Sequence, residues 1–373
     1  MTALLNNWYA KDAIVLVVVG IMGWIGSLLM RREVWRSAMR QVFRRRMVRI
    51  SAFILALYTL IAILDSVGYH PPLRDADHAL HRHPETGRVL YDQDGKSLLD
   101  LILTPLSAMH EKTYSAPLAA TQFTMETLYD DEGNTTRGYP PLAHPRRHLL
   151  GTDRVGNDVL YLAIKGIRTG MIIGGFTTLL VIPFAILFGV TAGYFRGWVD
   201  DAIQYVYTVL SSIPSLLLII SFMIVFGRGL TQLCIIMGIT SWTGLCRVLR
   251  GETLKLRELE YVQAAEAMGV SRPRIMFQHI VPNLMHIVLI TAVLSFSGRV
   301  LAEAVLSYIG IGVGAATISW GSMINAARQE LARDPIIWWK LVAAFVFMVG
   351  LVLPANLFGD ALRDALDPRL RTE

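Results

Sequence analysis

Charged residues and cysteines are both scarce in this 373-residue chain. Only 17% of the residues are charged while 53% are hydrophobic, whereas about a quarter of a typical soluble domain is charged. Cys234 and Cys246 lie in or at the ends of one apolar run, about 18 Å apart if that run is helical, so they cannot bridge each other. They have no metal-ligand spacing either, and we expect both to be small core residues. This composition favours a membrane protein over a soluble all-helical one.

Motifs for several kinds of chemistry are also missing. The chain has no Gly-x-x-x-x-Gly-Lys-Ser/Thr phosphate loop, so it cannot bind and hydrolyse ATP by that route. It shows neither paired histidines nor a nucleophile beside its base, as an integral-membrane enzyme would need. An ion-coupled secondary transporter is an alternative, although such proteins usually carry more spans, often as internal repeats, and we see no convincing half-to-half similarity.

Long apolar runs dominate what is present. A transmembrane helix needs about 20 predominantly apolar residues, and suitable runs occur at residues 13–30, 50–67, 171–194, 206–226, 231–248, 284–308 and 337–358. Asp65 interrupts the second run, and Pro183, Pro214 and Pro354 lie within three others. Such prolines are tolerated in membrane helices because neighbouring groups satisfy the freed backbone. The sequence therefore predicts an all-α polytopic protein with seven spans.

The distribution of arginine predicts the orientation of these spans. Arginines concentrate in three segments, at residues 31–49, 247–274 and 363–371. Basic residues in short loops mark the cytoplasmic side, and with seven spans all three segments fall on one face. We therefore expect the N-terminus and the segment 68–150 outside, and the C-terminus inside. The net charge of +6 then reflects topology and contact with membrane lipid, and no nucleic-acid partner is expected.

Residues 68–150, here called the insert, are polar and rich in turn residues. Asp94-Gly95 predicts a β-hairpin between RVLY and SLLDLI, and a weaker copy of the same pattern follows at residues 128–134. Neither copy fits a calcium-binding EF-hand loop, because the glycine is misplaced and no glutamate closes the loop. His78, His81 and His83 are able to capture a soft divalent ion, but we expect a solvated loop there.

Residues 252–283, here called the polar loop, form a charged segment of helical pattern between two apolar runs. We expect one helix to end at Gly269, where glycine tolerates a left-handed cap. A second short helix should begin after Ser271, with Pro273 in its first turn, and stop near Pro282. Ala264 and Ala265 leave a small-residue surface that a neighbouring protein can approach closely. This pattern suits docking to a partner.

Several motifs, read together in their order, carry a family resemblance. GTDRVGNDVL (151–160), AGYFRGWVDD (192–201), SSIPS (211–215), LAEAVLSYIGIGVG (301–314), SWG (319–321) and NLFGDALRDALDPRL (356–370) resemble the permease subunits of bacterial ABC importers, in the dipeptide and oligopeptide branch that also includes nickel and opine importers. Residues 261–283 resemble that family's cytoplasmic signature. The resemblance covers about residues 150–370. Gln263 stands where the family usually has Glu, and Asn157 where it commonly has Arg.

The resemblance implies an architecture and a set of partners. It implies a six-span permease core, to which this chain adds a first helix with its basic linker (1–49) and the insert (68–150); the core consists of residues 50–67 and 151–373. The protein would lie in the bacterial inner membrane with a second permease, two ATPase subunits that bind ATP and Mg, and an external substrate-binding protein. The chain itself would be no enzyme and hold no cofactor. The implied substrates are di- and oligopeptides, with nickel chelates, opines or glutathione-like compounds as alternatives.

The same resemblance implies which residues meet the ATPase. These lie in the polar loop and are Glu260, Tyr261, Gln263, Ala264, Ala265, Glu266, Met268, Gly269, Val270, Ser271 and Arg272. Separately, Arg299 and Glu303 lie four residues apart within an apolar run, so they share one helix face. Ionisable residues at membrane depth are functional candidates. They form either a structural pair within the helix or part of the translocation path.

Overall fold

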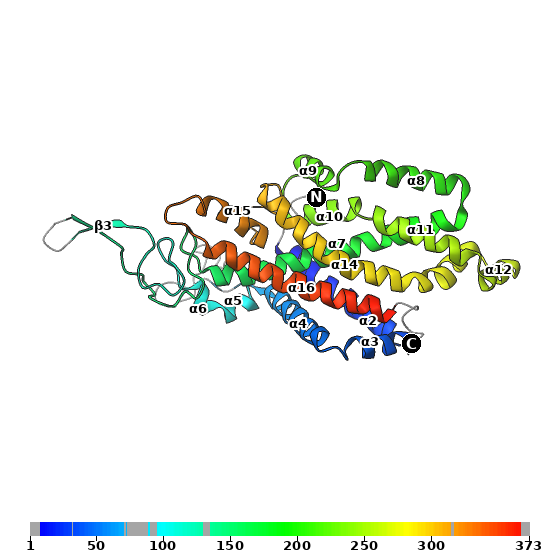
Figure 1. Cartoon of the computed structure of the whole chain (residues 1–373), viewed down its shortest axis with the longest axis horizontal. Helices are drawn as coiled ribbons and strands as arrows, with labels where there is room; N and C mark the ends of the chain where they lie inside the picture. The colour runs from blue at the N-terminus through cyan, green and yellow to red at the C-terminus, as the bar shows by residue number, and fades with distance from the viewer. Residues whose placement is uncertain are drawn as a thin grey trace. The chain divides into compact units, whose positions relative to one another are not determined.

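The computed structural model describes residues 8–31, 33–70, 72, 89, 95–129, 135–314 and 317–366, and the described chain is mostly helical (Figure 1). Its elements in chain order are α2 (Trp8–Met30), α3 (Glu33–Val42), α4 (Arg46–Ser66), β1 (Gly68–Tyr69), β2 (Lys96–Ser97), α5 (Leu98–Ile102), α6 (Thr104–Ser107), β3 (Glu126–Tyr129), β4 (Thr135–Gly138), α7 (Val159–Phe195), α8 (Gly197–Ser212), α9 (Ser215–Phe226), α10 (Leu230–Thr240), α11 (Thr243–Arg257), α12 (Glu260–Ala267), α13 (Arg272–Ile275), the π-helical segment η1 (Met276–Ile280), α14 (Val281–Tyr308), α15 (Trp320–Glu330) and α16 (Trp339–Leu366). They belong to two compact units. Unit 1 comprises Met1–Val17, Leu57–Gly170 and Ile318–Met348, and unit 2 comprises Val18–Ala56, Met171–Thr317 and Val349–Glu373.

The helices account for most of the predicted spans. Within the described residues, five helices are long and apolar enough to cross a membrane, or six if the bent pair α8–α9 is one span. Helix α2 occupies the first predicted span, and the total of seven stays a prediction. The span predicted at residues 206–226 is not one straight helix, because α8 and α9 meet at 87°. Pro214 causes this break, since the residue before a proline is pushed out of helical geometry, and Ile213 has an extended ψ of 130°.

Helix α7 begins well before the apolar run that predicted it. Its N-terminus is capped by Asp158, whose Oδ1 accepts hydrogen bonds from the backbone N–H groups of Leu160 at 2.8 Å and Tyr161 at 3.2 Å. Asp158 is therefore the N-cap of α7. The helix then continues for 37 residues through Pro183.

In unit 2, α7 and α11 touch through their backbones. A Cβ atom at Gly189 would lie 2.8 Å from the carbonyl oxygen of Cys246, and one at Gly193 would lie 2.7 Å from that of Arg250. Small residues are what allow helices to approach this closely. Cys234 and Cys246 are buried free thiols, as predicted.

Helix α3 packs its apolar stripe within unit 2. Trp35, Ala38 and Val42 are buried against the last turns of α16, and Arg45 pairs with Asp364 at 2.9 Å. The basic linker therefore contains an amphipathic helix with its apolar face packed on the protein and exposed arginines on its other side.

The insert differs from its predicted form. Only Ser97 of SLLDLI belongs to a strand, β2, and the other five residues form helix α5, because Ser97 and Asp100 make a reciprocal capping box. At the second copy of the pattern a hairpin does form, where β3 pairs antiparallel with β4. The predicted turn at Asp94 and the histidines His78, His81 and His83 lie outside the described residues.

The GTDRVGND segment forms a tight loop in unit 1. Asp153 Oδ1 accepts hydrogen bonds from the backbone N–H groups of Val155 and Asn157, at 2.9 and 3.0 Å. Gly156 has φ +83°, and a Cβ there would collide with the carbonyl of Glu111. The motif thus fixes the chain just before α7 begins.

Candidate functional site

The polar loop is a set of short helices seated on the core of unit 2. Helix α12 turns Val262 and Ala265 inward, three residues apart and therefore on one face, and both are almost fully buried. Ile275 and Ile280, from α13 and η1, are buried in the same cluster. The apolar side of the loop thus holds its position while the polar side is left at the surface.

Gly269 ends α12 as the sequence predicts. Its φ is +78°, a left-handed conformation that costs other residues about 1–2 kcal/mol. Its N–H bonds to the carbonyl of Glu266 at 3.0 Å, and the N–H of Val270 bonds to the carbonyl of Ala265 at 3.1 Å. These two bonds form a Schellman motif, which reverses the chain from α12 toward α13.

The second helix of the loop does not stop near Pro282, so that prediction was wrong. The helix begins after Ser271, with Pro273 in its first turn as expected, and then runs without a break through η1 and α14 to Tyr308. The wider π-helical turn lies just ahead of Pro282. Such a bulge accommodates a proline inside a helix, because it shifts the carbonyl that the proline ring would otherwise meet.

Most of the residues assigned to ATPase docking lie at the surface. Met268 is 77% exposed and Tyr261 is 42% exposed. The others that are exposed are Glu260, Gln263, Ala264, Glu266, Gly269, Ser271 and Arg272. Val270 is half-buried, and Ala265 is only 3% exposed. The expected small-residue surface therefore contains Ala264 but not Ala265, which supports the loop from inside.

Hydrogen bonds stabilise the loop and its neighbouring helix ends. Gln263 Nε2 donates to the carbonyl of Glu258 at 3.2 Å, so the residue that departs from the family pattern stabilises the start of α12. Asn283 Nδ2 donates to the hydroxyl oxygen of Tyr261 at 3.0 Å. Arg257 Nη1 donates to the carbonyl of Tyr194 at 2.7 Å, which ties the end of α11 to the end of α7.

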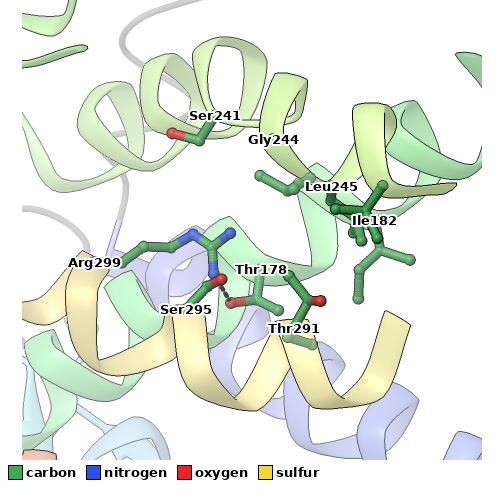
Figure 2. Close-up of a pocket in the computed structure, with 11 residues that line it drawn as sticks. Thr178, Ile182, Ser241, Gly244, Leu245, Thr291, Ser295 and Arg299 are labelled. Atoms are coloured by element: carbon green, nitrogen blue, oxygen red, sulfur yellow. Dashed lines mark hydrogen bonds between the residues drawn. The ribbon is translucent and has the colours of Figure 1, made fainter. Parts of the chain in front are cut away.

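Arg299 and Glu303 are both buried in α14, at 9% and 2% exposure. Arg299 Nη1 donates to Thr178 Oγ1 at 2.7 Å, and Glu303 Oε1 accepts from Ser307 Oγ at 2.6 Å. Arg299 borders a cavity of about 200 Å³ in unit 2, shown in Figure 2, and Glu303 is not among its lining residues. The cavity is lined by Thr178, Val181, Ile182, Ser241, Gly244, Leu245, Val248, Thr291, Ala292, Ser295 and Arg299.

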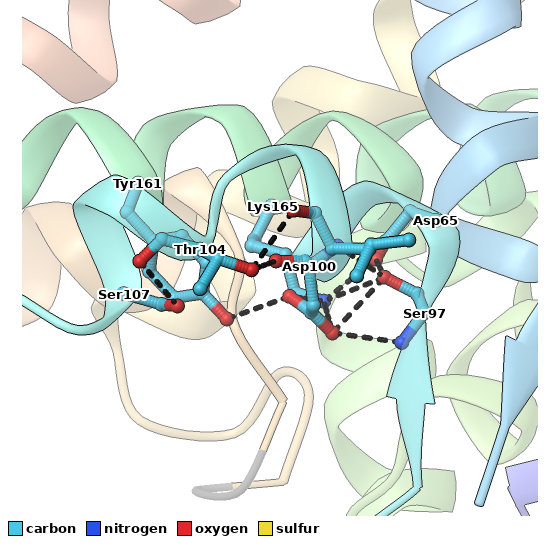
Figure 3. A network of polar contacts seen from close by, with 8 residues as sticks. Asp65, Ser97, Asp100, Thr104, Ser107, Tyr161 and Lys165 are labelled. Atoms are coloured by element: carbon cyan, nitrogen blue, oxygen red, sulfur yellow. Dashed lines mark hydrogen bonds and ion pairs between the residues drawn. The ribbon is translucent and has the colours of Figure 1, made fainter. Parts of the chain in front are cut away.

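Unit 1 contains a charged cluster that sequence reasoning missed (Figure 3). Lys165 Nζ lies 2.6 Å from Asp65 Oδ1 and 2.9 Å from Asp100 Oδ1, and Tyr161 donates to Asp100 Oδ1 at 2.9 Å. Burial raises the pKa of Asp100, but hydrogen bonds from Ser97 and Lys165 outweigh it and hold that pKa below its ordinary value. The signal in the sequence was Asp65 inside an apolar run. Its partner Lys165 was not recognisable, because the two lie 100 residues apart.

A second buried cluster joins the insert to the start of α7. His148 Nδ1 lies 2.8 Å from Asp158 Oδ2, and His148 Nε2 lies 3.4 Å from Glu111 Oε1. Burial raises the pKa of Glu111, but backbone hydrogen bonds from Ala143 and His144, together with His148, outweigh it and lower that pKa. Among the described residues, no group of histidine, cysteine and carboxylate side chains is arranged to hold a metal ion.

Comparison with known proteins adds a family and several relatives. Residues 185–372, which include the polar loop, match the family described as "Binding-protein-dependent transport system inner membrane component". The chain is 36% identical over 224 residues to the oligopeptide transport system permease protein OppC of Bacillus subtilis, covering 60% of this chain and 72% of that protein. It is 32% identical over 237 residues to the dipeptide transport system permease protein DppC of the same organism, covering 64% of this chain and 72% of that protein.

A further relative and a solved structure extend this comparison. The glutathione transport system permease protein GsiD of Pectobacterium atrosepticum is 32% identical over 226 residues, covering 60% of this chain and 74% of that protein. Among solved structures, a chain of the MetNI methionine ABC transporter in inward-facing conformations is similar at 16% identity. It has a TM-score of 0.46, covering 56% of this chain and 97% of that chain.

Proposed function

Because the chain belongs to the family of binding-protein-dependent transport system inner membrane components, we propose that it forms half of the translocation path of an ATP-driven importer of di- and oligopeptides. The similar proteins named for oligopeptide and dipeptide transport support this substrate class. Two ATPase subunits would supply the energy by binding ATP and Mg, since the sequence contains no phosphate loop of its own. A second permease would complete the path, and an external binding protein would deliver the peptide.

The polar loop is the observation that carries this proposal. Its outer face presents exposed side chains from Glu260 to Arg272, which are polar or small apart from Tyr261 and Met268, while Val262 and Ala265 anchor it in the core. An ATPase that grips this face can therefore move α12 together with the helices beneath it. Movement of those helices would switch the permease between outward and inward access. A ligand or partner shifts such an equilibrium only through different affinity for the two states.

The proposal also includes an orientation in the bacterial inner membrane. The polar loop and the C-terminus would face the cytoplasm, and the N-terminus and the insert would face outward. The arginine-rich segments support this arrangement. The added first helix and the insert would then be available to components on the outer side.

Replacing Gly269 tests the proposed coupling. Gly269→Val places a β-branched residue at φ +78°, which strains the turn between α12 and α13 by at least about 1–2 kcal/mol. We expect uptake of a labelled dipeptide to fall by at least about tenfold while the protein still inserts in the membrane. Gly251→Ala is the matched control, since a Cβ there meets nothing within 4 Å. Unchanged uptake in the Gly269→Val variant would contradict the assignment of the polar loop.

Purification in gentle detergent tests the partners and the energy source. Co-purification of a second permease and two ATPases is expected, and uptake should require ATP rather than an ion gradient. Uptake that collapses with a proton or sodium ionophore at constant ATP would instead indicate a secondary transporter. Competition by glutathione, an opine or a nickel chelate would identify the alternative substrates, of which glutathione is supported by the similarity to GsiD.

A further inference from the structure

Arg299 brings a buried positive charge to the wall of the cavity, and the function proposed for the polar loop does not use that charge. Arg299 is nine-tenths buried within α14, one of the helices able to cross a membrane. Charged groups at membrane depth are costly, and they usually pair with another group or face the route of a substrate or ion. The surroundings of this guanidinium group therefore indicate what it binds.

Thr178 holds the arginine in a fixed direction. The Thr178 hydroxyl donates to the carbonyl of Gly174 at 2.5 Å and accepts from Arg299 Nη1 at 2.7 Å. The Nε atom of Arg299 is buried and has no hydrogen-bond partner among the residues that the structure describes. Figure 2 shows the guanidinium group extending from α14 to Thr178, next to Ser295 and on the same side of α14 as Thr291. Arg299 Nη1 thus has its hydrogen bond to Thr178, and the Nε–H group of the same side chain is left for a ligand.

The lining of the cavity matches one end of a peptide. The hydroxyl groups of Ser241, Thr291 and Ser295 are able to donate or accept hydrogen bonds. Apolar side chains, including Ile182 and Leu245, form the rest of the wall. The volume of about 200 Å³ is below the roughly 300–1,000 Å³ of pockets that enclose a whole drug-sized ligand. It suits a terminal residue with its charged group.

Glu303, the acidic residue nearest to Arg299 in the sequence, is not part of the cavity wall. Glu303 lies one helical turn further along α14, accepts the hydroxyl of Ser307, and does not line the cavity. The described lining contains Arg299 as its one charged side chain. An arginine fork is suited to a carboxylate, since parallel N–H groups match its two oxygens.

We infer that this cavity binds the C-terminal carboxylate of the transported peptide, with Arg299 as its charge partner. Ser295 and Thr291 provide further hydrogen bonds, and the apolar wall contacts the last side chain. This inference rests on the proposed function, because it requires a peptide substrate. It names the part of the peptide that the permease itself recognises.

Binding to the purified importer without its binding protein tests this inference. The probes are tri-alanine with a free carboxylate and the same peptide as its C-terminal amide. Binding is measured from the rise in unfolding temperature during titration, because a ligand of the folded state stabilises it. For the wild type, we expect tri-alanine to bind at least about tenfold more tightly than the amide. For Arg299→Gln, both peptides should bind equally weakly, and Arg299→Lys should keep part of the preference for the acid.

Two controls keep the result interpretable. The Arg299→Gln complex must purify with its subunits and unfold at the wild-type temperature without peptide; failure to assemble would indicate a structural role and overturn the inference. Gly244→Leu fills the cavity without changing Arg299, since a Cβ at Gly244 meets nothing within 4 Å, and it should abolish binding of tri-alanine while Gly244→Ala leaves it within about twofold.

The two proposals fail in different ways. Equal affinity of the wild type for acid and amide, or an unchanged preference in Arg299→Gln, would overturn the inference while peptide uptake by the complete importer still supports the function. Absence of peptide uptake by the complete wild-type importer would contradict the proposed function itself.

Discussion

At the scale of single residues, Lys165 holds two carboxylates together in unit 1. Replacing it by methionine keeps much of the side-chain length but leaves Asp65, which is 3% exposed at its side chain, beside Asp100 without the cation. Removing one partner of a buried ion pair costs about 3–5 kcal/mol. We therefore expect a clear fall in the unfolding temperature of Lys165→Met. Lys112→Met is the control, because the Lys112–Glu126 pair lies at the surface and such pairs contribute about 0–1 kcal/mol. A fall in unfolding temperature for Lys165→Met that is no larger than the fall for Lys112→Met would show that the buried cluster stabilises the fold no more than a surface pair does.

Glu111 predicts how the insert responds to acid. Because its folded pKa is below its ordinary value near 4.5, the carboxylate stabilises the folded state fully above that value. The contribution is lost as the pH falls further, through the lower folded pKa. We expect protection from hydrogen exchange, relative to the intrinsic exchange rate at each pH, to fall in residues 111–129 and 135–148 below about pH 4.5.

Glu111→Gln is the corresponding variant for this acid response. It removes the ionisable group. The protection of this segment from exchange should therefore be lower at neutral pH than in the wild type, and it should change less between neutral and acid pH. An acid response identical to that of the wild type would exclude Glu111 as its source.

At the scale of secondary-structure elements, α3 is held to α16 by its apolar stripe. Ala38 is 1% exposed in that contact. A carboxylate introduced by Ala38→Glu would be buried without a partner, which strongly destabilises the packing. We expect residues 31–45 to become sensitive to limited proteolysis in this variant. Ser37→Glu, at an exposed position of the same helix, should remain resistant, and sensitivity in both would indicate an effect of charge alone.

Local signals predicted the polar loop well where one residue decides the geometry. Gly269 marked the end of α12, because a left-handed cap depends on the residue itself. Ser271 marked the position where α13 begins, although its side chain makes no capping hydrogen bond. Pro282 misled the prediction, because the adjoining π-helical turn that accommodates it has no pattern in the sequence. SLLDLI was assigned to a strand although Ser97 and Asp100 form a helix-capping box. The contacts of Lys165 and Arg299 were out of reach, since each joins residues 65 or more positions apart.

At the scale of the whole molecule, the orientation in the membrane is open to direct measurement. We predict that Ala3→Cys and Arg137→Cys react with a membrane-impermeant maleimide added from outside, whereas Met268→Cys reacts only after the membrane is opened. Cys234 and Cys246 are completely buried, so the unmodified protein provides a low background. Labelling of Ala3→Cys from inside only would overturn the seven-span topology, and labelling of Met268→Cys from outside would reverse the orientation.

The direct backbone contact between α7 and α11 has a mechanical consequence. Most helix pairs are separated by side chains, which absorb small shifts by changing rotamer. At Gly189 and Gly193 there is no side chain on α7 to do so, and α12 shares the core cluster that surrounds this contact. A displacement of α11 would therefore move α7 by nearly the same amount, because no side chain of α7 lies between the two backbones to absorb it. Even a methyl group at either glycine would push the two helices apart, and it would change the angle between them in the absence of any movement of α11.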